Sequence, residues 1–430
     1  MKIFSMIKIL LPALILTGLI ACQKDTIEKN SSGFVSVVDT DLDYTSRGCL
    51  QLTDGNYIIY GSNVLFPSGN TAFGTTYSAM AKFSPSGDLI WQKNLPITLF
   101  DLWKGIALPG GGFVLAGLDN MPENTNITIA KFSNNGGLVK STQLLNSTGS
   151  VSTSRNEVDI IRLKNGNYAM VLIGTEPGVL GNSPRLLIFD QELNILTDKI
   201  FPSMFLFSKN YKGQRLAEGN DGKIYICGRT QEFNAWSWTF LMGVNGSTLD
   251  MDFFNERMGG DTNSYPGPFV VSDAGHVIIT TSEQWNAGIY FNASNYFYFH
   301  SDEYFSVGKT VSVLETDADG NFIARHKYSG FTGYASLTNI TRTSDGGYLL
   351  IGTCDLKTDV IVYSQFQILM IKINAQFQQE WMKQINTTYP AVAVDVKNTN
   401  DGGLLIGAYQ KSFNKNYKMM LIKTDANGVM

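Results

Sequence analysis

The residues of this chain that are best suited to bind a ligand are aromatic, and one segment concentrates them. Between residues 282 and 306, aromatic rings alternate with Asn, Ser and Asp, and the candidate ligand-binding residues there are Trp285, Tyr290, Tyr296 and Tyr298. Such rings can stack on sugars while amides bond the hydroxyl groups, or they can form a protein-binding patch. The alternative is an extra hairpin whose alternate rings pack against its neighbours.

A second set of aromatic residues recurs near the start of successive strand-like segments. Its members are Tyr44, Trp103, Tyr211, Tyr265, Tyr334 and Tyr389. If these segments surround a common axis, the rings could form a platform for stacking sugars. Packing between repeated units would explain the same recurrence.

Signals for catalysis are sparse. The histidines His276, His300 and His326 lie on separate segments, so no pair has metal-ligand spacing on one element. Nucleophile elbows, zinc-protease motifs and phosphate loops are absent from the sequence. Loop carboxylates that could serve a polysaccharide-cleaving enzyme are Asp101, Asp119, Glu157 and Asp261, and solvated loop acids explain them equally well. We therefore expect neither a metal nor a cofactor, and the sequence leaves enzymatic activity open without favouring it.

The run from Asp317 to Asn321 superficially resembles a calcium loop. Its glycine is misplaced for an EF-hand, and Tyr328 stands where the bidentate Glu would be. A hairpin turn is the expected structure.

The amino terminus has the order of an export signal. Lys2 and Lys8 precede an apolar run over 9–20, which is too short to span a bilayer comfortably. The following Leu19-Ile20-Ala21-Cys22 resembles the lipobox of bacterial lipoproteins. That resemblance implies a signal peptide over 1–21, cleavage before Cys22 and lipid on its sulfur. The alternative is an ordinary secretory signal with an incidental cysteine.

Residues 22–32 are polar and predict a flexible tether. Gln23-Lys24-Asp25 resembles the surface-export signal of Bacteroidetes lipoproteins, which implies an outer-membrane lipoprotein exposed at the cell surface. The net charge of −4 and the absence of a Lys/Arg cluster argue against nucleic acid as a partner. Cys49, Cys227 and Cys354 have neither disulfide nor zinc spacing and are expected to be buried thiols.

A repeat organises the rest of the chain. A turn containing Gly is followed by an apolar run, as in Asp54-Gly55-Asn56-Tyr57-Ile58, and copies begin at positions 54, 110, 165, 221, 273, 345 and 401. All intervals but one are close to 55 residues, and the long one contains the aromatic segment. A second phrase follows each first one, an apolar strand that ends in a Gly turn, as in Ala81-Lys82-Phe83-Ser84-Pro85-Ser86-Gly87.

Together the two phrases predict four antiparallel strands per unit, joined by tight hairpins. The second strand is apolar without alternation and must be covered on both faces, which radial stacking of the sheets provides. We predict a seven-bladed all-β propeller over 33–430. The seventh unit ends before its fourth strand, so the strand-like run over 34–39 should complete that blade. A β-sandwich array or an open solenoid is the alternative.

The repeat resembles the Asp-Gly-Gly-Tyr type propeller repeats of exported Bacteroidetes proteins. Trp91 and Trp381, near the turn glycines, are similar to the docking tryptophans of quinoprotein propellers. Only two units carry this tryptophan, so a quinone cofactor is not implied.

Ligands of propellers usually bind among the variable loops, which here follow second and fourth strands. The first hypothesis is a non-catalytic binding protein for a glycan or another nutrient-derived ligand, attached to the membrane through a lipid at Cys22. The alternatives are an exported polysaccharide hydrolase or lyase and a scaffold that binds envelope proteins.

Overall fold

The computed structural model describes most of the region that the repeat covers. The described residues are 33–38, 44–63, 78–95, 99–119, 127–144, 158–174, 182–201, 209–232, 237–256, 264–283, 310–331, 333–356, 366–411 and 417–430. The predicted signal peptide and tether, with Cys22, lie outside them. Residues 284–306 of the aromatic segment, with Trp285, Tyr290, Tyr296 and Tyr298, also lie outside them. Within the described ranges, none of the structure is a long apolar helix able to cross a bilayer.

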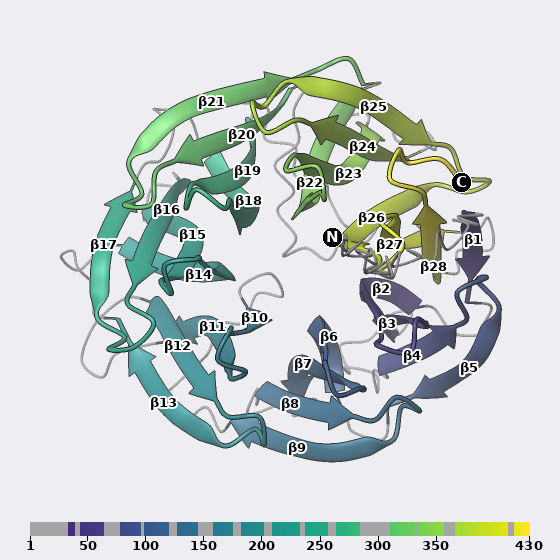
Figure 1. Cartoon of the computed structure of the whole chain (residues 1–430), viewed down its shortest axis with the longest axis horizontal. Helices are drawn as coiled ribbons and strands as arrows, with labels where there is room; N and C mark the ends of the chain where they lie inside the picture. Colours follow the sequence, from purple (N-terminus) through teal and green to yellow (C-terminus); the bar gives the residue numbers. More distant parts are fainter. Residues whose placement is uncertain are drawn as a thin grey trace, which may run out of the picture.

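Seven four-stranded antiparallel sheets surround a central axis (Figure 1). From the axis outward, the first four blades are β2 (Tyr44–Gln51), β3 (Tyr57–Asn63), β4 (Ser78–Phe83) and β5 (Leu89–Asn94); β6 (Leu99–Ala107), β7 (Phe113–Asp119), β8 (Ile127–Phe132) and β9 (Leu138–Leu144); β10 (Asp159–Arg162), β11 (Tyr168–Gly174), β12 (Ser183–Phe189) and β13 (Ile195–Ile200); and β14 (Lys209–Glu218), β15 (Ile224–Glu232), β16 (Ser237–Val244) and β17 (Met251–Glu256).

The remaining three blades follow the same order. They are β18 (Ser264–Val271), β19 (Val277–Glu283), β20 (Val311–Thr316) and β21 (Phe322–Tyr328); β22 (Tyr334–Arg342), β23 (Tyr348–Leu356), β24 (Gln367–Ile373) and β25 (Gln379–Ile385); and β26 (Ala391–Asn398), β27 (Leu404–Lys411), β28 (Tyr417–Thr424) and β1 (Phe34–Val37). The predicted seven-bladed propeller is therefore confirmed.

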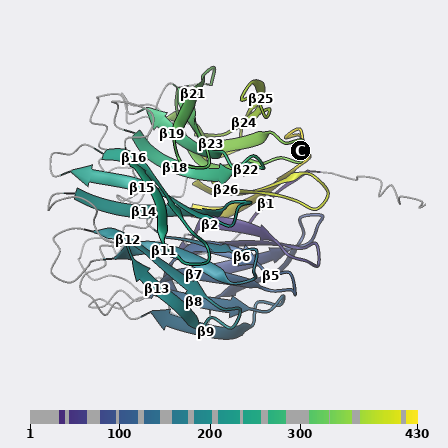
Figure 2. The ribbon, with the colours of Figure 1, turned by 60° about the vertical axis from the view of Figure 1, so that its left-hand side comes forward.

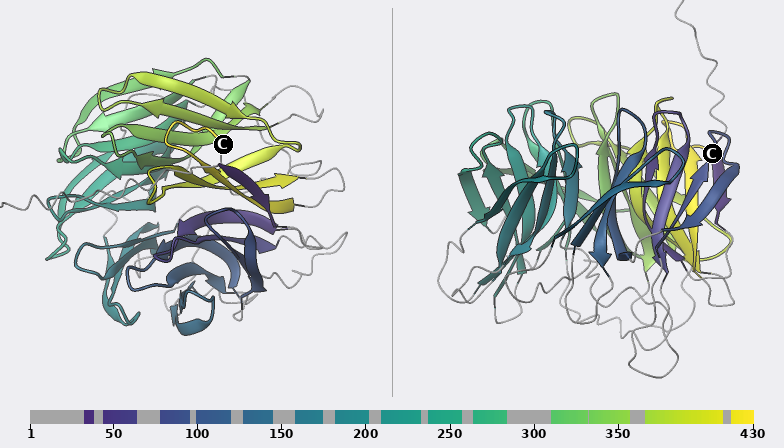
Figure 3. Two further views of the ribbon diagram at one scale, coloured as in Figure 1. Left: turned by 45° about the vertical axis from the view of Figure 1, so that its right-hand side comes forward. Right: turned by 90° about the horizontal axis from the view of Figure 1, so that it is seen from below.

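The turns after first and third strands are tight and share one face of the disc (Figure 3). In the first of them, the Gly55 N–H donates to the Leu52 carbonyl at 3.0 Å, the Leu52 N–H donates to the Asn56 carbonyl at 2.8 Å, and Gly55 has a φ of 82°. This left-handed conformation suits glycine, which lacks a Cβ, and explains why the repeat places Gly there. Seen from the side, the strands run across the thickness of the disc (Figure 2).

The hydrophobic core lies between the blades. Every residue of β11 is buried, as its unalternating apolar sequence predicts. One apolar cluster joins Tyr60 and Met80 of blade 1 to Phe113 and Phe132 of blade 2. Each sheet is thus covered on both faces by its neighbours. The cysteines 49, 227 and 354 are buried free thiols, as expected.

The ring is closed by the chain segment that the sequence indicated. Strand β1 pairs antiparallel with β28, and Phe34 lies opposite Lys423 while Val37 lies opposite Met420. Figure 1 shows β1 at the outer edge of the seventh blade. The strand ends at Val37, slightly earlier than the run over 34–39.

The outer rim repeats one contact between each fourth strand and the next blade. An aromatic ring covers the glycine of the next blade's second turn, and the pairs are Phe34 with Gly87, Trp91 with Gly136, Phe253 with Gly320 and Trp381 with Gly428. A Cβ on any of these glycines would lie within 3.0 Å of the ring that covers it. We call this the rim contact. Trp91 and Trp381 therefore each pack against the next blade.

In the other three blades the two positions hold different kinds of residue. The turn residue is Leu193, Leu249 or Phe377, each with a positive φ near 60°, and the residue at the aromatic position is Lys140, Thr197 or Ala324. In these three blades the bulky side chain therefore belongs to the turn, and the Phe377 ring stacks on His326 of the preceding blade with 4.2 Å between ring centroids.

Candidate functional site

The innermost strands share a local irregularity that re-aims one side chain. Strands β2, β6, β14, β22 and β26 each contain a β-bulge near the middle. The residue just after the bulge stands seven positions before the turn glycine of its blade. Over all blades this axial position holds Gly48, Lys104, Asp159, Arg215, Pro268, Asn339 and Asp395. Bulges commonly redirect side chains at functional sites.

Asp159 ties three blades together. Its Oδ2 accepts the backbone N–H of Leu216 in β14 at 3.0 Å, and its Oδ1 accepts that of Ile160 at 3.0 Å. The ammonium of Lys104 in β6 lies 3.5 Å from Oδ1. The side chain is only 4% exposed, so its oxygens are used within the protein.

Asp395 makes the corresponding contacts on the other side of blade 1. Its Oδ2 accepts the N–H of Cys49 at 3.2 Å, and its Oδ1 accepts that of Val396 at 3.0 Å. The same Oδ1 is bonded by the Asn339 amide and lies 3.0 Å from the Lys397 ammonium. Both axial carboxylates thus join the inner strand of the next blade.

The cations at the axis are more accessible than the carboxylates. The side chains of Lys104 and Lys397 are 27% and 32% exposed, whereas those of Asp159 and Asp395 are each 4% exposed. Desolvation lowers the pKa of Lys104. The charges of Lys397 and Arg215 also lower this pKa, whereas the charges of Asp159 and Asp395 raise it. These five residues lie on the innermost strands of four blades, which surround one axis.

The other axial lysine is held charged. Desolvation acts to lower the pKa of Lys397, but the charge of Asp395 raises it above its ordinary value. The accessible surface of this part of the axis is therefore formed by ammonium groups, with carboxylates behind them.

Blade 1 contributes a hydroxyl in place of an axial side chain. A Cβ on Gly48 would lie 2.2 Å from the Tyr60 hydroxyl, so that hydroxyl occupies the space that a side chain at position 48 would fill. It is buried and makes no hydrogen bond of standard geometry to the described residues. Burial and the charge of Asp395 raise the pKa of Tyr60 well above its ordinary range. The same two causes raise the pKa of the buried Cys49 thiol.

The aromatic residues predicted from the sequence are only partly within reach of the structure. Tyr44 is 1% exposed, and its hydroxyl donates to Asn94 of the same blade at 2.9 Å. Its ring belongs to an apolar cluster that includes Leu405 and Met419 of blade 7, which fits packing between blades. Tyr389 is half-buried. The side chains of Trp103, Tyr211, Tyr265 and Tyr334 lie outside the described part of the chain. Their role as a platform remains a prediction.

The structure also brings together two histidines that the sequence kept apart. His276, just before the second strand, and His326 of the fourth strand contact different oxygens of Glu315, at 2.8 and 3.2 Å. The three do not form a metal site, and no other group of His, Cys, Asp and Glu within the described ranges does. Among the loop acids, Glu157 and Asp261 lie outside the described residues, as do the side chains of Asp101 and Asp119.

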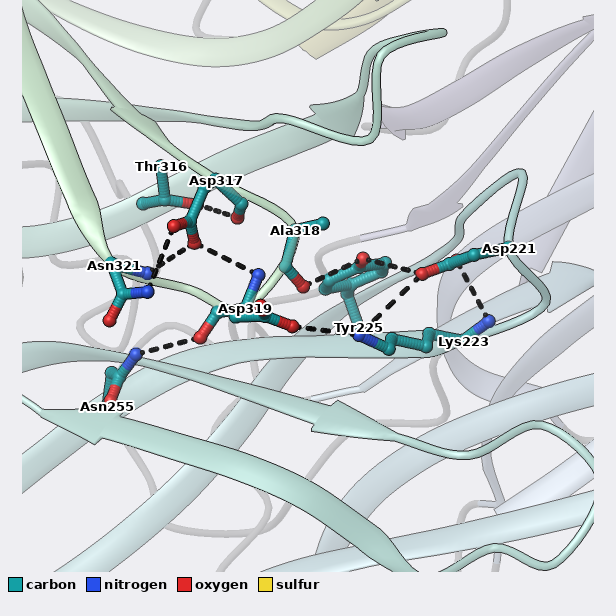
Figure 4. A network of polar contacts seen from close by, with 9 residues as sticks. All are labelled: Asp221, Lys223, Tyr225, Asn255, Thr316, Asp317, Ala318, Asp319 and Asn321. Atoms are coloured by element: carbon teal, nitrogen blue, oxygen red, sulfur yellow. Dashed lines mark hydrogen bonds and ion pairs between the residues drawn. The ribbon is translucent and has the colours of Figure 1, made fainter.

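The calcium-like run is a hairpin turn, as expected (Figure 4). The Asp317 carboxylate accepts the backbone N–H groups of Asp319 and Asn321 at 3.0 and 2.8 Å. Although burial acts to raise it, these bonds lower the pKa of Asp317. Asp319 reaches Lys223 of the preceding blade at 3.1 Å, so the turn links two blades.

Comparisons with known proteins show no family for this chain. No protein-family model matches the sequence, and no curated protein is significantly similar to it. A protein of unknown function from Dyadobacter fermentans is similar in structure, with a TM-score of 0.49, 11% identity, and coverage of 91% of this chain and 97% of that one.

Two enzymes are similar to a comparable degree. The polysaccharide lyase Uly1 has a TM-score of 0.49 and 10% identity, with coverage of 86% of this chain and 88% of that one. The Trypanosoma rangeli sialidase has a TM-score of 0.41 and 9% identity, with coverage of 92% and 58%. At such identities the likeness is one of propeller architecture alone.

Proposed function

We propose that the protein is an outer-membrane lipoprotein, anchored through Cys22, whose propeller axis binds a glycan without chemically transforming it. The lipobox resemblance supports the anchor. One observation carries the binding role. The axis presents partly exposed ammonium groups from two blades on a wall that is rigid, because buried carboxylates bond it to the backbone. Hydrogen-bond donors held on rigid elements suit a ligand rich in hydroxyl groups.

We propose a non-catalytic role because the axial carboxylates are bonded to the protein backbone. Hydrolysis of a glycosidic bond ordinarily needs two carboxyl groups that can reach the scissile bond. Asp159 and Asp395 instead accept backbone N–H groups of two strands each. They act as supports of the wall.

A glycan array followed by calorimetry on the full chain in detergent tests this proposal. We expect saturable binding of at least one saccharide and no new reducing ends or unsaturated products after prolonged incubation. Product formation would show an enzyme, and binding to envelope proteins alone would show a scaffold. The anchor fails if Cys22→Ser leaves the protein in the membrane fraction.

A further inference from the structure

The axial wall is asymmetric in charge. From blade 7 through blade 4, the axial positions described above hold the cations Lys104 and Arg215 and the carboxylates Asp395 and Asp159. A third cation, Lys397, stands two residues after Asp395 and lies 3.0 Å from its carboxylate. Blades 5 and 6 contribute Pro268 and Asn339, which are uncharged. The charge that solvent can reach lies on one arc of the wall and is positive.

The two carboxylates do not use up the donors of the lysines. Each Asp already accepts two backbone N–H groups, so its oxygens are shared between several donors. An ammonium carries three N–H groups. Lys397 directs one of them to Asp395 at 3.0 Å, and Lys104 lies at the longer distance of 3.5 Å from Asp159. Both lysines keep donors for another acceptor.

The two lysines flank a gap in the ring of axial side chains. Lys104 belongs to blade 2 and Lys397 to blade 7, and blade 1 between them has Gly48 at the axial position. Behind this glycine the Tyr60 hydroxyl is buried and lacks a hydrogen bond of standard geometry to the described residues. The nearly inaccessible Asp395 carboxylate also lies behind Gly48, with its Oδ2 3.1 Å from the position of a Cβ on that glycine. The partly exposed charges on the two sides of Gly48 are the ammonium groups of Lys104 and Lys397.

We propose that the wall at Gly48 is a subsite for an oxyanion, and that Lys104 and Lys397 bind the carboxylate or sulfate group of an acidic saccharide there. The saccharide rests on the proposed function, whereas the oxyanion follows from the axial charges. Hydrogen bonds between ammonium and oxyanion groups are stronger than those between neutral groups. An anion at this position also relieves the mutual repulsion of the cations that lowers the pKa of Lys104.

Calorimetry on the full chain with matched saccharides tests this subsite. One pair is an oligogalacturonate and its methyl ester, and the second is a sulfated oligosaccharide and its desulfated form. We expect the charged member of at least one pair to bind about tenfold or more tightly than its neutral partner. The first pair reports carboxylate recognition and the second reports sulfate recognition.

Variants assign any such preference to the wall. Lys104→Gln and Lys397→Gln should each weaken binding of the charged saccharide by about tenfold. Lys104→Arg, which keeps the charge, should retain most of the affinity and controls for folding. Lys327→Gln, on the exposed outer strand β21, is the matched control and should change nothing.

The possible outcomes separate the two proposals. If neutral saccharides bind as tightly as charged ones, the subsite is wrong and the glycan-binding function stands. If charged saccharides bind but both glutamine variants behave like the parent, the site lies elsewhere. If no saccharide binds, the proposed function itself falls, and glucuronate and sulfate alone then test the oxyanion subsite, which their failure to bind would overturn.

Discussion

The outer rim and the axial wall obey different rules although the same repeat builds both. At the rim, four blades have a turn glycine that is covered by an aromatic ring of the preceding blade, and the other three have Leu193, Leu249 or Phe377 in that turn. At the axis, the seven equivalent positions hold Gly, Lys, Asp, Arg, Pro, Asn and Asp. Packing between neighbours explains the rim fully. It does not require accessible lysines at the axis, so the axis is where selection for a ligand can act.

Two axial residues have a structural role, as the rim residues do. Asp159 and Asp395 are axial, yet each bonds the backbone of the next blade and is nearly inaccessible. The axial wall therefore contains structural carboxylates and accessible cations side by side. Substitutions should separate these two groups by their effect on stability.

The largest effect is expected for Asp395→Ala. The change leaves the buried N–H of Cys49 without its acceptor and Lys397 without its counter-charge. Removal of one partner from such a buried network costs about 3–5 kcal/mol. Guanidinium unfolding followed by tryptophan fluorescence measures the loss. Asp395→Asn keeps one acceptor oxygen and should lose less, and a loss below about 1 kcal/mol for the alanine variant would contradict this role.

A smaller effect is expected at the rim, where substitutions can move the large side chain from the fourth strand to the turn of the next blade. Trp91→Thr removes the ring that covers Gly136 and should cost about 2–3 kcal/mol, less than for a fully buried Trp because Trp91 is half-buried. Gly136→Leu alone should also destabilise, since its Cβ would meet the ring and its φ is 71°. The double variant has the residue types that stand at the equivalent positions of blades 3 and 4, Thr197 and Leu249.

The double variant should be more stable than the sum of the two single losses by at least about 1 kcal/mol, as measured by the same unfolding experiment. Trp381→Thr combined with Gly136→Leu is the control, because Trp381 covers Gly428. Equal coupling energies in the two double variants would mean that the rim contact is not specific.

The fold was predictable because its determinants are local and periodic. Turn glycines recur about every 55 residues, and the second strands are apolar without alternation, so blade number and closure by residues near Phe34 followed from the sequence. The rim contact was only partly visible. Trp91 and Trp381 stood out, but Phe34 and Phe253 serve the same role and look like ordinary strand residues.

The axial site was not predicted, although a signal for it exists. The signal is a constant spacing: Lys104, Asp159, Arg215 and Asp395 all stand seven residues before a turn glycine. A constant offset places residues in one ring, and charge inside an inner strand is unusual enough to suggest a function. The partners of these groups come from other blades, as in the bond between Asp159 and Leu216, and no local pattern contains that information.

The smallest effect is expected for a lysine and aspartate pair that recurs near the first turns of several blades. Unlike the charges at the axis, these charges belong to the repeat. In blade 6, Lys372 lies 2.8 Å from Asp345, and equivalent pairs join Lys82 to Asp54 and Lys423 to Asp401. Burial acts to raise the pKa of Asp345, but bonds from Lys372, Thr343 and the Gly347 N–H lower it to about 2. A carboxyl whose pKa is lower in the folded than in the unfolded protein stabilises the fold above its unfolded pKa, near 4.

That stabilisation is lost as the pH falls from about 4 to about 2. Because the Asp345 side chain is 55% exposed, solvent screening limits it to about 1 kcal/mol or less. Asp345→Asn should therefore lower stability slightly at pH 7 and converge with the parent near pH 2, as measured by unfolding across this range. Asp88→Asn is the matched control, because serine hydroxyls rather than a lysine bond its carboxylate. If the difference between Asp345→Asn and the parent stays constant with pH, the repeated pairs do not stabilise the folded protein through their charge.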